Sequence, residues 1–279
     1  MAGKSAALKK DATTATTTVA AKKATKPGTA VALKKGGAVV DANAIREQLR
    51  AQAAAMNERT NPASGNKIMP GNDKMFKLPD GSKVPELRAV IVDFVTTHNF
   101  YERPFDPKNI LPPGCFAVGT NPKDMAPVAD SPNLQAENCQ VCPMNEFGSA
   151  GDGKACKNGR RLALLPLNDD GDDVDAEADI LILDVSPTAI KGFDSYVQTL
   201  ARTYQMPPVG FVTTITMDPN VDHAKVMFSD PQPIDGVGNA VARQAEAKDM
   251  LMQKPDFSGW VPVSAPKGRS APAKTGGRR

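Results

Sequence analysis

Residues 180–217 read ILILDVSPTAIKGFDSYVQTLARTYQMPPVGFVTTITM and predict a strand, a helix and a second strand, in that order. Ser186 is suited to cap the helix, and Pro187 is suited to its first turn. The helix then carries a single apolar stripe at helical spacing, made by Ile190, Phe193, Val197, Leu200 and Tyr204. The helix ends before Pro207, and the apolar, β-branched runs on either side of it have the composition of strands.

Working outward from this unit, further segments have the length and composition of strands, and one more helix closes the core. The predicted strands are residues 87–95, 161–167, 180–185, 209–217 and 224–228, and the last helix is predicted over 239–252. A short apolar piece at 75–78 precedes them. The Asn-Pro, Ser-Gly and Pro-Gly pairs of residues 58–73 predict a linker.

This order predicts a mainly β fold of the α+β class. Apart from the piece at 75–78, the chain runs strand, cysteine-rich insert, strand, strand, helix, strand, strand. An OB-fold is a five-stranded barrel, and its helix lies between the third and fourth strands. We therefore predict an OB-fold-like five-stranded barrel with a metal loop inserted after its first strand and helices at the side. A generic α+β sheet with a helix on one face gives the same order and stays an alternative.

All four cysteines lie in one window, at Cys115, Cys139, Cys142 and Cys156, with the spacing C-x23-C-x2-C-x13-C. The Cys-x-x-Cys turn directs two thiolates at one point in space, and two more sulfurs complete a tetrahedral shell for zinc. The stretch is rich in Pro, Gly and Asn and needs a source of order other than an apolar core. We predict a metal-binding insert over 112–160 that holds one structural zinc per chain.

Three other states of these cysteines are open. Free cysteine behaves as a small hydrophobe, so the four thiols could be buried separately. A disulfide is less favoured, because no signal peptide is present and cytosolic thiols stay reduced. Pro143 follows the Cys-x-x-Cys turn as in iron–sulfur motifs, which makes a cluster the alternative cofactor. Four cysteine ligands leave no open position for water activation, so such a metal is structural.

Charge divides the chain into a core and two tails. The first forty residues carry eight lysines and one aspartate, and residues 261–279 carry five basic residues and no acid. Of the net charge of +3, the tails contribute +12, so residues 41–260 carry −9. Segments of this composition cannot bury enough apolar surface to order themselves. The predicted organisation is a disordered basic tail over 1–65 with a possible helix over 42–57, a β-rich core over 66–256, and a second disordered basic tail over 257–279.

Part of the negative charge is concentrated in NDDGDDVDAEAD, residues 168–179. A solvated loop between two strands is the prediction for this stretch. A calcium loop of the EF-hand type is disfavoured, because Val174 occupies a position that needs an oxygen ligand. Magnesium binding by some of the acids from Asp169 to Asp179 is the feature that a nuclease or recombination factor would need.

The stretch NCQVCPMNEFGSAGDGKACKNGRRLALL, residues 138–165, resembles a motif in proteins of tailed bacteriophages, most of which lack an assigned activity. The resemblance extends from FKLPDG at 76–81 to PVGFVTTITM at 208–217, the middle half of the chain. The layout is similar to that of phage single-stranded DNA-binding proteins, whose barrel carries a zinc module. Those proteins end in an acidic tail, whereas this chain ends in Gly-Gly-Arg-Arg, which weakens any inference about recruited partners.

What this resemblance implies is binding of single-stranded DNA in the cytoplasm of an infected bacterial host, in replication or recombination with other proteins. The residues expected to contact phosphates on one face are Lys154, Lys157, Arg160 and Arg161, and Phe147 is expected to stack on a base. The alternatives are that these cations form a solvated face and that Phe147 packs over the metal site.

Signs of catalysis are scarce, and we predict no enzyme activity and no small-molecule substrate. No nucleophile elbow, phosphate-binding glycine loop or zinc-protease motif is present, and the histidines His98 and His223 lie far apart. No run of eighteen apolar residues predicts a membrane span. The alternative functions are a module that docks a protein partner through the metal loop, and the nuclease or recombination factor.

Overall fold

The computed structural model describes residues 65–262 apart from Pro107, Asp169, Asp172 and Ala176, together with Gln48, Gln52 and Met56. These last three are helical and fall inside the helix predicted over 42–57. The rest of that helix, and the predictions of disorder for the other residues of 1–64 and for 263–279, lie outside the described residues. No helix in the described part is long and apolar enough to cross a membrane.

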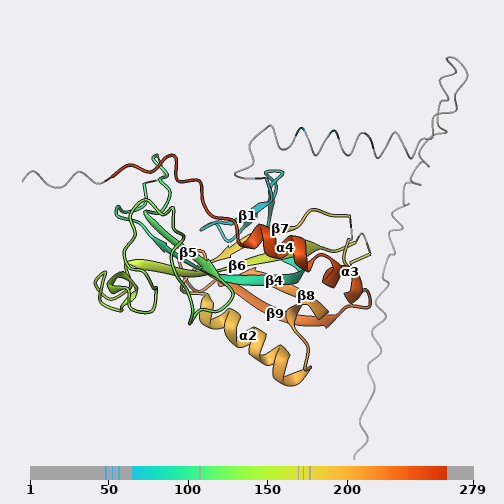
Figure 1. Cartoon of the computed structure of the whole chain (residues 1–279). Coiled ribbons are helices and arrows are strands. Elements are labelled where there is room, and N and C mark those ends of the chain that lie inside the picture. Colours follow the sequence, from blue (N-terminus) through green and yellow to red (C-terminus); the bar gives the residue numbers. More distant parts are fainter. Residues whose placement is uncertain are drawn as a thin grey trace, which may run out of the picture. The chain divides into compact units, whose positions relative to one another are not determined.

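The five longest strand predictions are confirmed, and they form the centre of one sheet (Figure 1). The elements are β4 (Leu87–Phe100), β6 (Cys156–Pro166), β7 (Leu181–Val185), α2 (Ile190–Thr203), β8 (Phe211–Met217) and β9 (Val226–Pro233). β4 pairs antiparallel with both β6 and β8, β7 adds to β6, and β9 adds to β8. The order across these strands is therefore β7-β6-β4-β8-β9.

Shorter strands extend the sheet to nine within the described residues, against the five expected. The additional strands are β1 (Lys67–Pro70), β2 (Phe76–Lys77), β3 (Lys83–Val84) and β5 (Cys115–Gly119). β1 pairs parallel with β7, β2 pairs with β1, β3 pairs with β2, and β5 pairs with the far end of β4. The linker prediction for 58–73 is thus wrong for β1, whose Ile68 is only 1 % exposed and belongs to the core.

The sheet is curled, and its mainly β, α+β class agrees with the prediction (Figure 1). A closed five-stranded barrel would need the strands at the two ends of the central five, β7 and β9, to pair. Among the described residues they do not pair, and β1 occupies the outer edge of β7 instead. The closed barrel is therefore not confirmed.

One face of the sheet is covered by α2. Of the predicted apolar stripe, Phe193 and Leu200 are buried and Ile190 and Val197 are partly buried, whereas Tyr204 at the end of the helix is 43 % exposed. Phe193, Tyr196 and Leu200 are the buried side chains of the helix. The ring of Phe193 meets those of Phe94 and Phe228 edge-on, each at 5.0 Å between centroids. The Tyr196 hydroxyl lies 2.8 Å from Thr213 Oγ1 on β8, so the buried phenol is satisfied. A 3-10 turn at Pro208–Gly210 then leads into β8.

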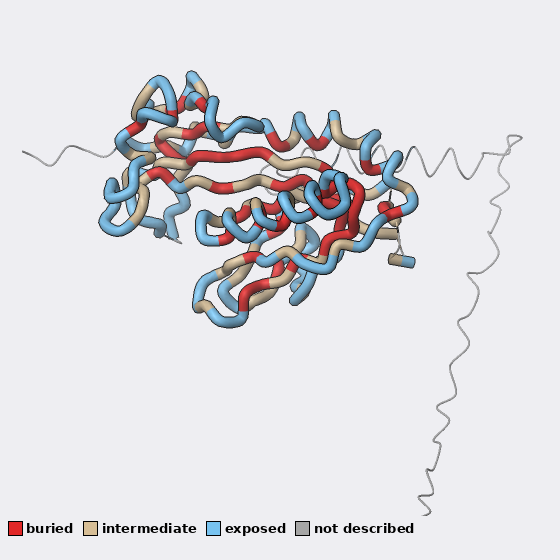
Figure 2. The backbone as a smooth tube through the Cα atoms, turned by 90° about the horizontal axis from the view of Figure 1, so that it is seen from below, coloured by how far each residue is buried: buried red, intermediate tan, exposed pale blue. Residues whose placement is uncertain are grey.

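The other face is covered near its middle by two short helices, α3 (Val237–Ala242) and α4 (Gln244–Leu251), where one helix was predicted. The break falls at Arg243, whose guanidinium donates to Glu246 and to the carbonyl of Ala178. Ala247 and Leu251 are buried in the same cluster as Val90 and Val95 of β4. Figure 2 shows the resulting pattern, with buried central strands between exposed helix surfaces.

Two residues beyond the predicted end of the core at 256 make hydrogen bonds with the folded part of the chain. Trp260 donates from Nε1 to Glu102 Oε2 at 3.1 Å, and the Arg103 side chain donates to the carbonyl of Pro262 at 3.1 Å. The start of the tail predicted to begin at 257 is thus held against Glu102 and Arg103, in the loop that follows β4.

Candidate metal centre and nucleic-acid interface

Three adjacent strands place the first part of the site on one face of the sheet. Phe100 of β4 lies opposite Cys115 of β5 on one side and Cys156 of β6 on the other. His98, two residues earlier, lies opposite Ala117 and Asn158. Residues two apart on a strand share a face, so these side chains form two rows on the face that α2 covers further along.

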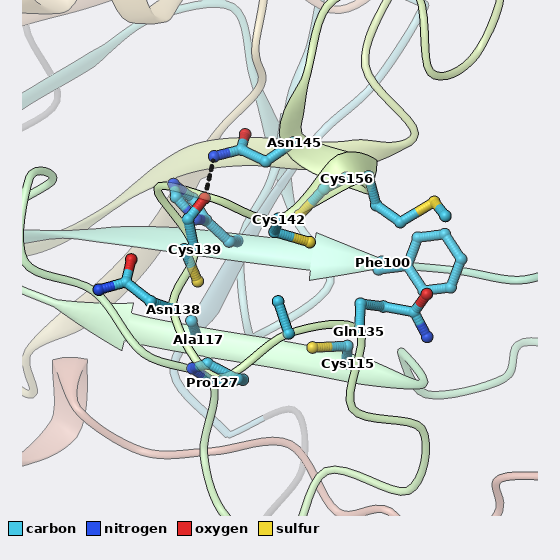
Figure 3. A pocket seen from close by; sticks show the side chains of 13 residues that line it. Phe100, Cys115, Ala117, Pro127, Gln135, Asn138, Cys139, Cys142, Asn145 and Cys156 are labelled. Atoms are coloured by element: carbon cyan, nitrogen blue, oxygen red, sulfur yellow. Dashed lines mark hydrogen bonds between the residues drawn. The ribbon is translucent and has the colours of Figure 1, made fainter.

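The loop that carries the other two cysteines folds over these rows. Cys139 N donates to Met125 O at 2.9 Å, and a 3-10 turn, η1 (Pro143–Asn145), follows Cys142. The Asn145 side chain donates from Nδ2 to Cys139 O at 2.8 Å, and its backbone N donates to Cys142 O at 2.9 Å (Figure 3). Asn145 therefore fixes the Cys-x-x-Cys turn from both sides.

All four cysteines line one small cavity, together with His98 and Phe100. Figure 3 shows the sulfurs projecting into the space beneath the loop. The cavity measures about 20 Å³, close to the space of one water-sized sphere. The sequence prediction that these cysteines meet is in this sense correct.

The environment of Cys139 and Cys156 favours the protonated form of both thiols. Burial, followed by the charge of the neighbouring cysteines, raises the pKa of Cys139 to about 11 and that of Cys156 to about 12. A bound cation would reverse this, since a coordinating thiol is deprotonated outright. The four cysteines are free of disulfides.

The ligand geometry for zinc is not formed as the side chains stand. Within residues 65–262 and the other described positions, no three His, Cys, Asp or Glu side chains are arranged to hold a metal ion. The zinc and the iron–sulfur alternative therefore stay predictions. The residues that fit a soft or borderline metal by chemistry are the four cysteines and the histidine beside them.

His98 is the residue of this site that sequence reasoning passed over. It is 5 % exposed. In the described chain, its Nδ1 and the Oδ1 of Asn158 are the two buried side-chain polar atoms without a hydrogen-bond partner. Burial, helped by the positive charges of Lys154 and Arg160, lowers the pKa of His98 to about 4, so the ring is neutral at pH 7. His98 is marked only by the pairing of β4 with β5 and β6, the two strands that carry Cys115 and Cys156.

The predicted basic face is divided by the structure. Arg160 donates to both carboxylate oxygens of Asp194 on α2, at 2.9 and 3.1 Å. Arg161 lies on the opposite face, where it pairs with Asp184 at 3.2 Å and donates to the carbonyls of Leu251 and Gln253. The prediction that the four cations share one face is wrong, because neighbouring residues of a strand point to opposite faces.

The other predicted contact residues do lie together, Phe147 and Lys154 on the loop before β6 and Lys157 at the start of β6. Phe147 is 82 % exposed, so the alternative that it packs over the metal site is wrong. Lys154 Nζ lies 5.1 Å from the Phe147 ring centroid and 3.2 Å from Asn145 Oδ1. Lys157 is exposed and donates to the carbonyl of Lys154 at 2.7 Å. Gly148, with φ at 91°, provides the left-handed turn that directs the phenylalanine outward.

The acidic stretch has the structure of a surface loop anchored at its middle. Val174 is buried in the core and bridges to Leu167. Asn168 Oδ1 accepts from the backbone N of Gly171 at 2.8 Å, which closes the turn. In the described part of the loop the carboxylates form no group that could hold a metal ion. Magnesium binding here gains no support.

Comparison with protein-family models, with curated proteins and with solved structures found no match for this chain. The assignment of a function therefore depends on the geometry and chemistry of the site.

Proposed function

We propose that this protein binds single-stranded DNA without catalysing a reaction, through the exposed surface of its cysteine-rich loop. The observation that carries the proposal is the pairing of a solvent-exposed aromatic with a cation, Phe147 with Lys154 at 5.1 Å, on a loop tied down by hydrogen bonds. Proteins that bind single strands combine aromatic rings for base stacking with cations that follow the phosphates. Lys157 is the second cation available on this surface.

The strand connections add support of a coarser kind. β4, β6, β7, β8 and β9 with α2 follow the connectivity of an OB-fold, with the first strand between the second and the fourth and the helix after the third. The OB-fold is a frequent scaffold for binding oligonucleotides. We propose that the sheet is an open relative of that barrel, its closing contact replaced by the pairing of β1 with β7.

In this proposal the metal has a structural role. Cysteine and histidine side chains of the cavity would hold one zinc, which supplies order to a loop that has little apolar core of its own. The cluster there, Ala117, Met125 and Cys139, is small beside the two clusters of the sheet. The stacking and phosphate contacts belong to side chains outside the cavity.

The decisive experiment is a titration of the full chain with labelled single-stranded and duplex oligonucleotides at low and moderate salt. We expect affinity of about micromolar or tighter for single strands at low salt, and weaker binding to duplex. The double substitution Lys154→Ala/Lys157→Ala should lower affinity for both, and Lys157→Ala alone, at an exposed side chain, should do so with thermal stability unchanged. Equal affinity for the two forms of DNA would contradict the proposal, since phosphate contacts alone do not discriminate them.

A second candidate function has its own observation. Phe105 and Ile110, in the loop that joins Phe100 to Cys115, and Val141, in the Cys-x-x-Cys turn, are large exposed apolar residues. Exposed apolar patches often mark protein–protein contacts. The loop would then dock a protein partner, of the replication or recombination machinery in a phage-infected cell. Loss of DNA preference in the titration above would bring this candidate forward.

A further inference from the structure

The sheet register sets a limit on which cysteines can share one metal ion. Cys115 and Cys156 are not on adjacent strands, because β4 runs between them and places Phe100 opposite both. In an antiparallel sheet a residue forms a hydrogen-bonded pair with one neighbouring strand and a non-hydrogen-bonded pair with the other. The Cα atoms of Cys115 and Cys156, on either side of Phe100, are therefore roughly 10 Å apart. The Phe100 side chain lies on the same face, between the two.

Sulfur ligands of one zinc need a closer spacing. A disulfide, with sulfurs about 2 Å apart, joins Cα atoms separated by at most about 7 Å. Two sulfurs on a tetrahedral zinc are roughly 3.8 Å apart, given bonds of about 2.3 Å, so their Cα atoms can be roughly 9 Å apart at most. A site that uses both strand cysteines is therefore strained while β5, β4 and β6 stay paired.

His98 offers a ligand at a shorter spacing. It is a diagonal neighbour of Cys156 on the adjacent strand and shares its face. Diagonal neighbours lie about 7–8 Å apart, and an imidazole reaches further than a thiol. Its ring lines the same cavity as the four sulfurs, it is 5 % exposed, and its buried Nδ1 has no partner.

We infer that the metal site consists of Cys139, Cys142, Cys156 and His98, and that Cys115 is not a ligand. These ligands suit a divalent cation that takes sulfur and nitrogen in a tetrahedral arrangement, zinc above all. Three cysteines with one histidine form a common closed structural zinc shell. The inference rests on the metal site of the proposed function and is independent of whether the loop binds DNA.

Burial distinguishes the two strand cysteines and decides which one is left out. Cys156 is 7 % exposed, whereas Cys115 is only partly buried. In Figure 3, Gln135 and Cys115 lie side by side at the edge of the cavity, and Cys156 lies beside Cys142.

Asn158 supplies the outer-shell partner that such a histidine needs. A metal-bound histidine almost always donates its other ring N–H to an oxygen. Asn158 lies directly opposite His98, its Nδ2 donates to Asn145 Oδ1 at 3.1 Å, and its Oδ1 is buried and free of partners. His98 Nδ1 and Asn158 Oδ1 are thus unpaired polar atoms on residues that lie opposite each other in the β4–β6 pair, and one ring nitrogen of His98 can bind the metal while the other donates to Asn158.

The test is cobalt(II) loading of the full chain and three variants, read by absorption, with X-ray absorption at the zinc edge as a second readout. The near-ultraviolet charge-transfer band grows with the number of cobalt–sulfur bonds. For the unsubstituted protein we expect the spectrum of a cobalt(II) ion bound by three sulfurs and one nitrogen. Cys115→Ala should keep that spectrum and its stoichiometry of one, and His98→Cys should convert it to the four-sulfur type. His98→Ala should weaken zinc affinity by more than about tenfold in competition with a chelator.

Each outcome separates the possibilities. A four-sulfur spectrum in the unsubstituted protein, or loss of metal in Cys115→Ala with no change in His98→Ala, would overturn the assignment of His98. No cobalt binding at all would overturn the metal site itself. DNA affinity measured on the same samples reports on the proposed function, so a failure of one is distinguishable from a failure of the other. Circular dichroism excludes unfolding as the cause of any loss.

Discussion

At the scale of single residues, one step along a strand moves a side chain to the other face of the sheet, as Arg160 and Arg161 illustrate. We expect Arg160→Ala to lower the free energy of unfolding by about 1–2 kcal/mol, since Asp194 loses its charged partner. Single-strand affinity should stay within about twofold of the unsubstituted value. Lys157→Ala is the matched control and should show the reverse: weaker DNA binding and stability within about 0.5 kcal/mol. Urea unfolding and fluorescence anisotropy measure the two quantities.

Phe147 tests the interface at the same scale. Phe147→Ala should weaken single-strand binding by about 1–3 kcal/mol, roughly five- to 150-fold, because one stacking platform is lost. Stability should not change, because the ring is almost fully exposed. Phe105→Ala removes an equally exposed phenylalanine, 79 % exposed, from another loop and should leave DNA affinity unchanged. A similar loss in both variants would mean that the effect is generic surface hydrophobicity.

Asp184 links a residue to the pH dependence of stability. Burial acts to raise the pKa of this carboxyl, but Lys67 and Arg161 outweigh it and hold the pKa below its usual value. A carboxyl with a depressed folded-state pKa stabilises the fold above its unfolded value near 4, and this contribution is lost as pH falls through the folded value. Asp184→Asn should therefore be less stable at pH 7 and lose less stability between pH 5 and pH 2. Identical acid unfolding curves would show that the pair contributes nothing.

The candidate site shows what residue patterns can and cannot predict. The spacing of the four cysteines was enough to predict that they meet, because a Cys-x-x-Cys turn directs its own two thiols. It could not predict which strands carry Cys115 and Cys156, since register depends on pairing partners far away in the chain. His98 has no local signal at all, and only its position opposite Ala117 and Asn158 marks it.

At the scale of elements, β1 carries more weight than its four residues suggest. Ile68→Ala should cost about 2–4 kcal/mol of unfolding free energy, because a fully buried side chain is truncated in the main core. Met69→Ala, one residue further and 57 % exposed, is the matched control and should cost less than about 0.5 kcal/mol. Equal effects would mean that β1 is not docked on β7. Denaturant unfolding followed by far-ultraviolet circular dichroism measures both.

The elements that were predicted from the sequence are those with strong periodicity. α2 has five apolar residues on one stripe, and the central strands have long β-branched runs, so both signals persist over several residues. β1, β2 and β3 have two to four residues each, too few for a hydrophobic period to be recognised. Each of them pairs with the free edge of a neighbouring strand, which the local sequence does not indicate. The helix predicted over 239–252 is divided at Arg243, whose guanidinium donates to one partner outside the helix, the carbonyl of Ala178.

At the scale of the whole molecule, the middle and the two ends of the chain carry opposite net charges. Residues 41–260 carry −9, and the two ends carry +12. A negative middle part repels nucleic acid at long range, so its local contacts at Lys154 and Lys157 act only at close approach. The lysines of residues 1–40 instead add affinity that is independent of sequence and strandedness and declines with salt.

This division gives a test of where discrimination originates. Replacement of the eight lysines of residues 1–40 by glutamine keeps the length and changes the net charge from +3 to −5. We expect duplex affinity to fall more than single-strand affinity, so the preference for single strands should rise. The slope of log affinity against log salt should become shallower by up to about 0.9 for each lysine that contacts duplex phosphates. If the preference for single strands disappears together with these lysines, the cysteine loop carries no recognition of DNA. The exposed apolar residues beside it then mark a protein contact, because neither charge nor stacking would remain to attract a nucleic acid there.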